Sequence, residues 1–530
     1  MAEALWTLAE LIAATGGEHE GRAASGAAGA SHDERASGMT PRSGDTPEPP
    51  FFIDQKTGSP EGVPPGGGGA SPADRIAVNG ISIDTRTIQP GDLFVALQDV
   101  RDGHEFVTAA FTAGAEAALV KRDYPRKPGD GALLRVDDPL AALESIGRAA
   151  RARLAPDARV IAVTGSAGKT GTKEMLRACL ATAGRVHASE KSYNNHWGVP
   201  LTLALMPADT QFGVFEIGMN HANEIRPLTK MVRPHVAIIT NVLPVHVGNF
   251  ADGEVGVAKA KAEIFEGLEP GGVAIMPRDG EHYEVLRRQA LAAHATVRTF
   301  GVTESANARS RLALHGSVGE RDERPGTDVR AEIDGRAVRY HLATPGQHIV
   351  TNTLAIALCF DSLGVLAEPT LAPLATIGPS QGRGQRTRFA ATGGPVLLID
   401  ESYNANPASM QWAIVLANLE VEAPYRRGVA VLGDMLELGD RAAKFHAEAG
   451  RFIAEAMENI DTVHACGPLM KHLYDALPVD RRGAWTLTSA ELIPHVTKDI
   501  RAGDVVMVKG SNGSKLALVV EAIKKHFAGP

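Results

Sequence analysis

The chain has 530 residues, which is too long for one ordinary domain and suggests about three. Its 54 lysines and arginines and 62 aspartates and glutamates give a formal charge of −8. This charge argues against a nucleic-acid partner, because phosphate backbones are bound by clustered basic residues.

Cysteine usage and hydropathy indicate an intracellular protein. Cys179, Cys359 and Cys466 are far apart and lack ligand spacing, so neither a disulfide framework nor a zinc site is expected. The N-terminal stretch MAEALWTLAELIAATGG has no basic region, which is not typical of a signal peptide. No run of about 18 apolar residues occurs, so no membrane span is expected. We expect a cytoplasmic monomer.

An N-terminal substrate-binding domain is predicted for residues 1–155. Apolar residues at helical spacing predict a first helix over residues 5–12, which Gly16 and Gly17 end. Residues 18–72 are rich in Gly, Ala, Ser and Pro, and they cannot bury enough apolar surface to offset the entropy of ordering. They are therefore predicted to be a disordered insertion. Strands at 93–97 and 117–120 then indicate a small α/β domain.

Two larger α/β domains are predicted to follow, over residues 156–380 and 381–530. Apolar strands at 160–164, 213–217, 236–241 and 273–276 alternate with helices. After a break at 376–384, strands at 396–400, 428–433, 462–467 and 504–510 do the same. Such alternation predicts a P-loop ATPase-like central domain with a parallel sheet and a Rossmann-like last domain. Ligands bind beyond the carboxyl ends of such strands, and the polar residues cluster there.

A short glycine-rich loop joins the first central strand to a helix. Its glycines let backbone amides face a phosphate, and the helix N-terminus adds positive potential. Lys169 would neutralise the β- and γ-phosphates of ATP, and the Thr170 hydroxyl would bind Mg²⁺. The alternative is a glycine-rich turn without a ligand. The predicted phosphate-binding residues are Gly165, Ser166, Ala167, Gly168, Lys169, Thr170 and Gly171.

Polar residues follow the next two strands as well. Glu216 ends a strand and could reach a magnesium ion held by Thr170, because a hard cation prefers oxygen ligands. A solvated glutamate at a strand end is the alternative. His246 lies beyond the third strand, where a histidine more often makes loop hydrogen bonds. By pattern alone, a solvated charged face is expected for three residues of the next helix, Lys259, Lys261 and Glu263.

Eight motifs in order resemble the Mur ligases: GSAGKTGTKEM, YNNHWGVPLTL, EIGMNHANEI, NVLPVHVGNF, AKAKAEIF, DESYNANPASM, LGDMLELG and VKGSNGS. The resemblance covers nearly the whole chain, from SIDTRTIQPGDLFVAL at 82–97 to the last helix. DESYNANP is the most discriminating motif, because relatives that add other amino acids differ there. The resemblance implies an ATP- and Mg²⁺-dependent ligase that adds D-alanyl-D-alanine to UDP-N-acetylmuramoyl-tripeptide, a peptidoglycan precursor.

The resemblance also implies roles for individual residues. Glu216 and His246 would bind two magnesium ions, and Lys261 aligns with the lysine that carbon dioxide carbamylates in related ligases. Four residues are implied in catalysis: Lys169, Lys261, Arg383 and His246. The implied UDP-substrate contacts are Asp84, Thr85, Arg86, Asn194 and Asn195. Further contacts to ATP are implied for Asn352, Arg383, Tyr403, Asn404 and Asn406.

Some features depart from the family pattern. Gly171 stands where relatives carry a threonine or serine, and the family assigns no role to the 18–72 insertion. VKGSNGSKL differs from the usual ending, so the resemblance does not define the dipeptide contacts. Two alternatives share parts of the pattern: a folylpolyglutamate synthase-like ligase, and a regulatory P-loop NTPase that forms no covalent product.

Overall fold

The computed structural model describes residues 4–21, 76–99, 101–189, 192–244, 247–302, 310–315, 326–343, 347–379 and 381–527. Contacts divide the chain into two compact units, Met1–Pro139 and Leu140–Pro530. The division falls earlier than the predicted boundary at 155, because helix α3 (Pro139–Ala152) packs within the second unit. A Cβ atom on Gly147 of α3 would lie only 3.1 Å from the Cβ of Leu203.

The first unit is built on a five-stranded sheet. Its order is β2 (Glu18–Glu20), β7 (Ala132–Val136), β6 (Ala117–Lys121), β5 (Asp92–Val95) and β4 (Gly80–Ser82). All pairs are parallel except β2 with β7. A smaller antiparallel sheet joins β1 (Trp6–Thr7) to β3 (Ala77–Val78). The helices are α1 (Leu8–Thr15) and α2 (Val107–Thr112), and α2 packs on a core that contains Phe94, Val107 and Leu133.

The N-terminal segment differs from the prediction at two points. The first helix begins at Leu8, because the preceding residues form a strand and Thr7 caps the helix in a capping box with Glu10. The predicted insertion begins too early, because Glu18–Glu20 is paired in the sheet and Glu20 Oε2 accepts a hydrogen bond from Arg135 Nε at 2.6 Å. The rest of the predicted insertion, residues 22–72, lies outside the described residues.

The second unit contains a nine-stranded sheet. Its order is β16 (Arg336–Leu342), β15 (Thr327–Ile333), β14 (Ser310–His315), β13 (Thr296–Gly301), β12 (Val273–Pro277), β11 (Val236–Ile239), β8 (Arg159–Thr164), β10 (Phe212–Glu216) and β9 (Val186–Ala188). The strands from β9 to β14 are parallel. The helices of this part are α4 (Lys169–Leu180), α5 (Gly198–Ala204), α6 (Ile225–Val232), α7 (Glu254–Ala262), α8 (Tyr283–Ala292), α9 (Gln347–Ser362) and α10 (Glu368–Leu371).

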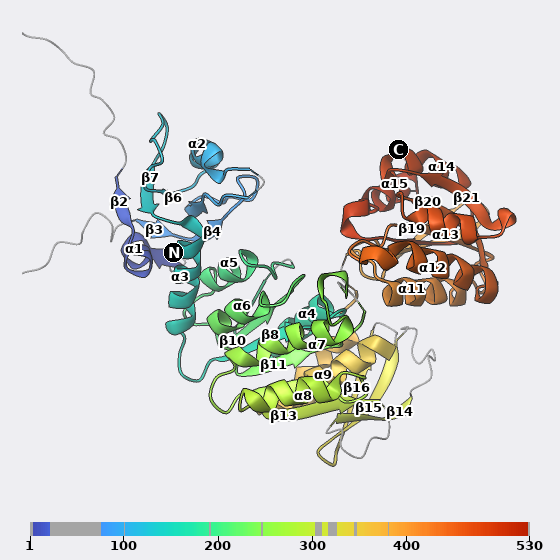
Figure 1. Cartoon of the computed structure of the whole chain (residues 1–530), viewed down its shortest axis with the longest axis horizontal. Helices are drawn as coiled ribbons and strands as arrows, with labels where there is room; N and C mark the ends of the chain where they lie inside the picture. Colours follow the sequence, from blue (N-terminus) through green and yellow to red (C-terminus); the bar gives the residue numbers. More distant parts are fainter. Residues whose placement is uncertain are drawn as a thin grey trace, which may run out of the picture. The chain divides into compact units, whose positions relative to one another are not determined.

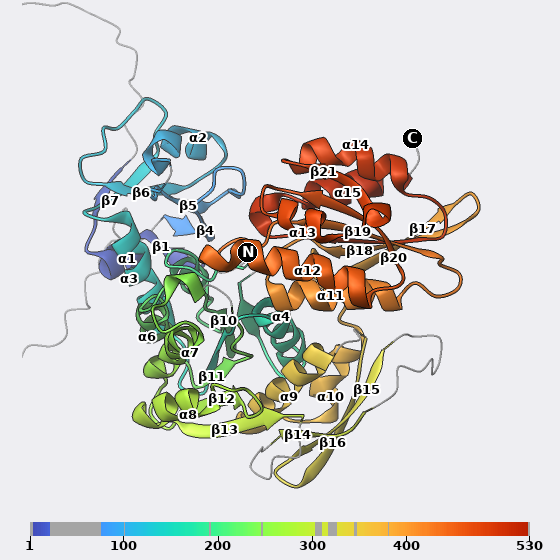
Figure 2. The same ribbon diagram turned by 45° about the vertical axis from the view of Figure 1, so that its right-hand side comes forward.

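The parallel prediction is confirmed for the middle of this sheet, but one edge is antiparallel. Strands β14, β15 and β16 pair antiparallel, and Figure 2 shows them beside α9 and α10. Asp334 and Gly335 both have positive φ, 48° and 80°, as a two-residue hairpin turn requires. Buried Arg298 on β13 ties this turn to α9, because its Nη2 lies 2.6 Å from Asp334 Oδ2 and 2.8 Å from Asp361 Oδ2.

A six-stranded sheet forms the last part of the chain. Its order is β17 (Gln385–Ala391), β18 (Gly394–Glu401), β22 (Asp504–Lys509), β19 (Arg427–Gly433), β20 (Ile460–Cys466) and β21 (Arg482–Thr486), and only β17 is antiparallel to its neighbour. In Figure 1, α11 (Pro407–Leu419), α12 (Ala442–Ala456) and α13 (Met470–Ala476) lie on one face, and α14 (Ser489–Asp499) and α15 (Ala517–Phe527) on the other. This arrangement confirms the predicted Rossmann-like domain.

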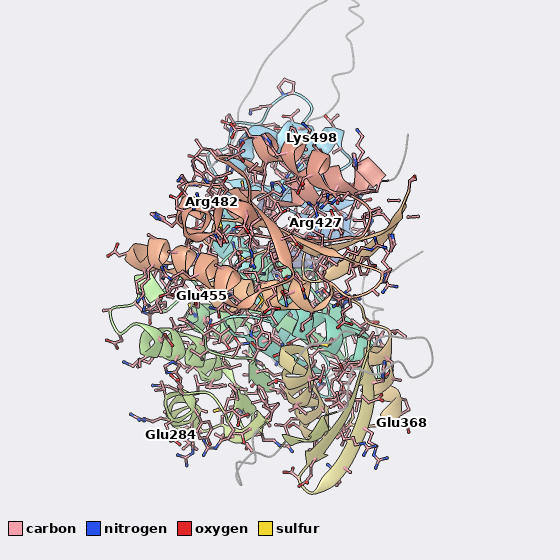
Figure 3. All side chains as sticks on the ribbon, turned by 90° about the vertical axis from the view of Figure 1, so that its right-hand side faces the viewer. Glu284, Glu368, Arg427, Glu455, Arg482 and Lys498 are labelled. Atoms are coloured by element: carbon pink, nitrogen blue, oxygen red, sulfur yellow. The ribbon has the colours of Figure 1, made fainter. Side chains whose placement is uncertain are left out.

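Both large sheets have apolar strands because helices cover both of their faces. In the middle sheet, α4 and α9 pack on one face through residues such as Leu176 and Leu354. At the start of β19, Arg427, labelled in Figure 3, forms a bidentate ion pair with buried Asp504. Among the described residues, no helix is long and apolar enough to cross a membrane.

Candidate functional site

The polar ends of the central strands meet those of the last sheet in one cleft. The cavity has a volume of about 520 Å³, within the usual range for a small-molecule site. It lies at the carboxyl ends of β8, β10, β18 and β22. The predicted site residues that line it are Ser166, Ala167, Gly168, Lys169, Thr170, Gly171, Asn194, Glu216, Asn352, Arg383, Tyr403, Asn404 and Asn406.

The phosphate loop requires glycine at two positions. It leaves β8 at Thr164, and α4 begins at Lys169. Gly165 and Gly168 have φ of +153° and +82°, which side-chain-bearing residues rarely adopt. A Cβ atom would lie 1.9 Å from Thr240 Oγ1 at Gly165, and 2.4 Å from Asn352 Nδ2 at Gly168. The loop is therefore packed tightly between β11 and α9.

The charges of Lys169 and Arg383 and the buried amine of Lys261 influence one another at this loop. Lys169 Nζ donates to the Gly165 carbonyl at 2.8 Å. Burial lowers the pKa of Lys169, Glu216 opposes this shift, and Arg383 lowers the pKa further. Burial also lowers the pKa of Lys261 well below its usual value, and the charge of Lys169 adds to this shift. Like charges held this close favour binding of a polyanion such as a triphosphate, which would offset their repulsion.

The three charged residues of the α7 segment have different environments. Lys259 is exposed and lies 2.6 Å from Asp252. Lys261 is only 2% exposed, so the expected solvated face was wrong for this residue. Glu263 is also buried, and its carboxylate accepts the backbone N–H groups of Asn223 and Arg226. Glu263 therefore stabilises the start of α6, whereas Lys261 is buried within reach of the charge of Lys169.

A candidate magnesium site joins the phosphate loop to β10. The Thr170 hydroxyl donates to Glu216 Oε2 at 2.8 Å and lies 3.1 Å from Ser192 Oγ. Asn194 Nδ2 donates to the other oxygen, Glu216 Oε1, at 2.7 Å. No cluster of three His, Cys, Asp or Glu side chains suited to a metal occurs in the described part of the chain. This oxygen set suits Mg²⁺, which takes few protein ligands when it binds beside phosphates. The other predicted ligand, His246, lies outside the described residues.

Arg383 enters the cleft from the linker before β17. It lies between Gly382 and Gly384, which have φ of +74° and +96°. The guanidinium carbon lies 4.0 Å from the centre of the Tyr403 ring, a cation–π contact that orients the side chain. The Tyr403 amide donates to the Gly382 carbonyl at 3.0 Å. The linker and the DESYNANP motif therefore support each other.

Some predicted ligand residues also make local contacts. Asn195 Oδ1 accepts the Gly198 amide at the start of α5, and the Asn406 side chain caps α11. Asn404 Oδ1 accepts the adjacent Ala405 amide. In the first unit, Asp84 forms a bidentate ion pair with exposed Arg86, with Thr85 between them.

Ser192, Glu401 and Lys509 are among the polar cleft residues that were absent from the predicted site. Ser192 lies beside Thr170, and its position carries no motif signal. Glu401 and Lys509 end neighbouring strands and line the cleft from the last sheet. The sequence did contain a signal for Glu401 and Lys509, because both lie at the carboxyl ends of strands, where polar residues cluster.

Comparisons with known proteins agree with this geometry. The chain matches the Mur ligase middle domain over residues 163–360 and the "Mur ligase, glutamate ligase domain" over residues 382–512. The UDP-N-acetylmuramoyl-tripeptide–D-alanyl-D-alanine ligase of Bacillus subtilis (strain 168) is 34% identical over 453 residues, 84% of this chain and 93% of that relative.

Two solved structures have the same fold. A crystal structure of MurF from Acinetobacter baumannii has a TM-score of 0.72 at 29% identity, covering 86% of this chain and 95% of that chain. MurF ligase from Thermotoga maritima, in complex with ADP, has a TM-score of 0.67 at 24% identity, covering 85% and 98%, and shows the fold alone. With the cleft geometry, the two domain matches and the extended identity, the chain belongs to the Mur ligase family.

Proposed function

We propose that this chain is the ATP-dependent ligase that joins D-alanyl-D-alanine to UDP-N-acetylmuramoyl-tripeptide in peptidoglycan precursor synthesis. The observation that carries the proposal is that Lys169 and Arg383 line one cleft at the strand ends of two sheets, with buried Lys261 close enough to Lys169 for their charges to interact. The name of the Bacillus subtilis relative and the DESYNANP motif support the choice of substrates.

The reaction must activate a carboxylate, because a free carboxylate does not form an amide at neutral pH. The terminal carboxylate of the tripeptide attacks the γ-phosphorus of ATP, the bond to the β-phosphate oxygen breaks, and ADP leaves. The amine of the dipeptide then attacks the acyl phosphate, loses a proton, and phosphate leaves. Phosphoryl transfer depends mainly on positioning and charge stabilisation, which are the roles proposed for Lys169 and Arg383. The acyl phosphate must be shielded from water, and residues 376–384 are proposed as the hinge of closure.

Magnesium would be held by Thr170 and Glu216, together with His246. The hydroxyl and carboxylate oxygens, 2.8 Å apart, are the ligand type that this ion prefers. When bound, the ion would neutralise charge on the phosphates.

Lys261 is proposed to be carbamylated. A lysine attacks carbon dioxide only as the neutral amine, and burial that lowers its pKa favours that form. Addition of carbon dioxide with loss of a proton would replace a buried amine with an anion next to Lys169. That change suits a site in which Lys169 alone already disfavours a second cation.

The remaining assignments are also proposals. Residues 1–155 would bind the UDP-sugar through Asp84, Thr85 and Arg86, residues 156–380 would bind ATP, and residues 381–530 would bind the dipeptide. Asn194 and Asn195 are proposed to face the nucleotide-linked substrate, and Asn352, Tyr403, Asn404 and Asn406 to face ATP. The protein is proposed to act as a cytoplasmic monomer.

The decisive experiment measures ADP release with UDP-N-acetylmuramoyl-tripeptide and different amines. D-Alanyl-D-alanine should support turnover, whereas single amino acids and glutamate should not. Turnover with glutamate on a folate-type acceptor would favour the folylpolyglutamate synthase-like alternative. ATP hydrolysis that needs neither amine nor carboxylate substrate would favour a regulatory NTPase.

A further inference from the structure

A buried lysine lines the cleft from the last sheet. Lys509 ends β22, is only 2% exposed, and donates to the Asn404 carbonyl at 3.0 Å and to Glu401 Oε2 at 3.3 Å. An ammonium group has three N–H donors, and in the described part of the chain two of them have acceptors. Because burial of a charge is costly unless it is well paired, the third donor favours an anionic ligand.

The carboxylate that pairs with Lys509 is that of Glu401, and it can accept a hydrogen bond from a second cation. Glu401 ends β18, directly opposite Lys509 in the parallel ladder. Its side chain is 24% exposed and lines the same cleft. The hydrogen bond to Lys509 involves only Oε2, so Oε1 can receive another donor. The two strand ends therefore present a negative and a positive group side by side.

The neighbouring hydroxyl of Ser511 is occupied by the fold. Ser511 Oγ donates to the Ala405 carbonyl at 3.3 Å and accepts the Leu436 amide at 3.0 Å. The guanidinium of Arg383 stacks on Tyr403, and its charge acts on Lys169. At these two strand ends, the charged pair of Glu401 and Lys509 is thus better suited to recognise a ligand than the serine hydroxyl.

We propose that this pair holds the two ends of the incoming dipeptide, with the ammonium on Glu401 and the terminal carboxylate on Lys509. The inference rests on the proposed function and names the contacts that the altered VKGSNGSKL ending left undefined. An extended dipeptide spans about 7 Å, so its two charges can flank an adjacent pair of opposite charges. The two charges of the dipeptide then lie on either side of the pair, and each charge of the protein gains a second partner.

This arrangement selects for a free C-terminal carboxylate on the amine substrate. D-Alanyl-D-alaninamide keeps the ammonium and both methyl groups but lacks that charge. Loss of one charge-assisted hydrogen bond in a partly buried site lowers apparent affinity about 10- to 100-fold. The wild type should therefore have a KM for the amide about 10- to 100-fold above its KM for the free dipeptide.

The test compares both amines in the ADP-release assay with wild type, Lys509→Met and Glu401→Gln. Lys509→Met should raise the KM for the free dipeptide about 10- to 100-fold and abolish the preference for it over the amide. Glu401→Gln should raise both KM values by the same factor. Lys498→Gln is the matched control, because Lys498 is exposed on α14 (Figure 3) and should leave all KM values unchanged.

The outcomes separate this inference from the proposed function. No ADP release by the wild type with either amine would reject the proposed function and this inference with it. Equal KM values of the wild type for the amide and the free dipeptide would reject the carboxylate contact alone. This comparison uses only the wild type, so it does not depend on whether a variant folds. Where Lys509→Met retains ADP affinity in calorimetry, a preserved preference for the free dipeptide would likewise overturn the assignment.

Discussion

Two glycines of one loop should respond to alanine in opposite ways. Gly165 has φ of +153°, and an added Cβ would lie 1.9 Å from Thr240 Oγ1 and 3.2 Å from the Asn241 amide nitrogen. Thr240 is buried, and its hydroxyl donates to the Ala167 carbonyl at 2.7 Å. Gly165→Ala must therefore either displace that hydroxyl or move the phosphate loop.

The cost of Gly165→Ala follows from these contacts. Backbone strain in this region costs about 1–3 kcal/mol, and a lost buried hydrogen bond costs about 1–3 kcal/mol more. The free energy of unfolding should fall by about 2–6 kcal/mol if the loop is held in place. If the loop moves instead, part of this energy appears as weaker ADP binding, at tenfold for each 1.4 kcal/mol.

Gly171→Ala provides the matched comparison. Gly171 lies in the first turn of α4, has an ordinary helical backbone, and no atom lies within 4 Å of an added Cβ. Alanine should therefore stabilise the protein by about 0.5–1 kcal/mol and leave ADP affinity unchanged.

Urea denaturation and calorimetric titration with ADP measure both effects. The summed loss in Gly165→Ala should reach at least about 2 kcal/mol. Wild-type stability together with wild-type ADP affinity in Gly165→Ala would refute the steric argument. A large loss in Gly171→Ala would show that the loop tolerates no change of any kind, which is contrary to its described packing.

Three further predictions concern charged and titratable groups. Removal of carbon dioxide from the buffer should lower turnover about 10²-fold, and added bicarbonate should restore it. The turnover of Lys261→Ala should respond to neither change. Full activity of the wild type without carbon dioxide excludes carbamylation. Glu216→Gln should raise the Mg²⁺ concentration needed for half-maximal ADP release at least about tenfold, and an unchanged titration removes Glu216 from the metal site. Burial, Arg151 and Arg159 lower the pKa of His235 to about 4. As the pH falls below about 6.5, His235 is protonated in the unfolded chain but not in the folded protein. The free energy of unfolding should therefore fall with falling pH, by up to about 1.4 kcal/mol per pH unit. His235→Asn should flatten the urea midpoint between about pH 7 and about pH 5, and an equal loss in the variant contradicts this origin.

Local patterns were sufficient for much of the fold and for part of the lining of the cleft. The strands β8, β10, β18 and β22 were predicted because a strand buried on both faces is a short apolar run between helical stretches. The phosphate loop was predicted because glycine spacing and the following helix belong to one continuous segment. Both depend on residues close together in the chain.

Other features depend on contacts that no local pattern contains. Lys259 and Lys261 lie two residues apart on α7, yet Lys259 is exposed and Lys261 is only 2% exposed, because the packing of α7 decides which of its sides is buried. Asn195 and Asn406 matched a ligand-binding pattern, and their side chains also accept backbone amides at the starts of α5 and α11, a role that the pattern did not contain.

The amino-acid sequence by itself determined the class of fold, the position of the phosphate loop and the family. The tertiary structure decided which distant charges meet: Lys169 with Arg383, and Glu401 with Lys509. The physical reason is that periodicity and glycine spacing act over one helix or strand. Burial and the pKa values that follow from it depend on strand order and on the elements that close over each side chain.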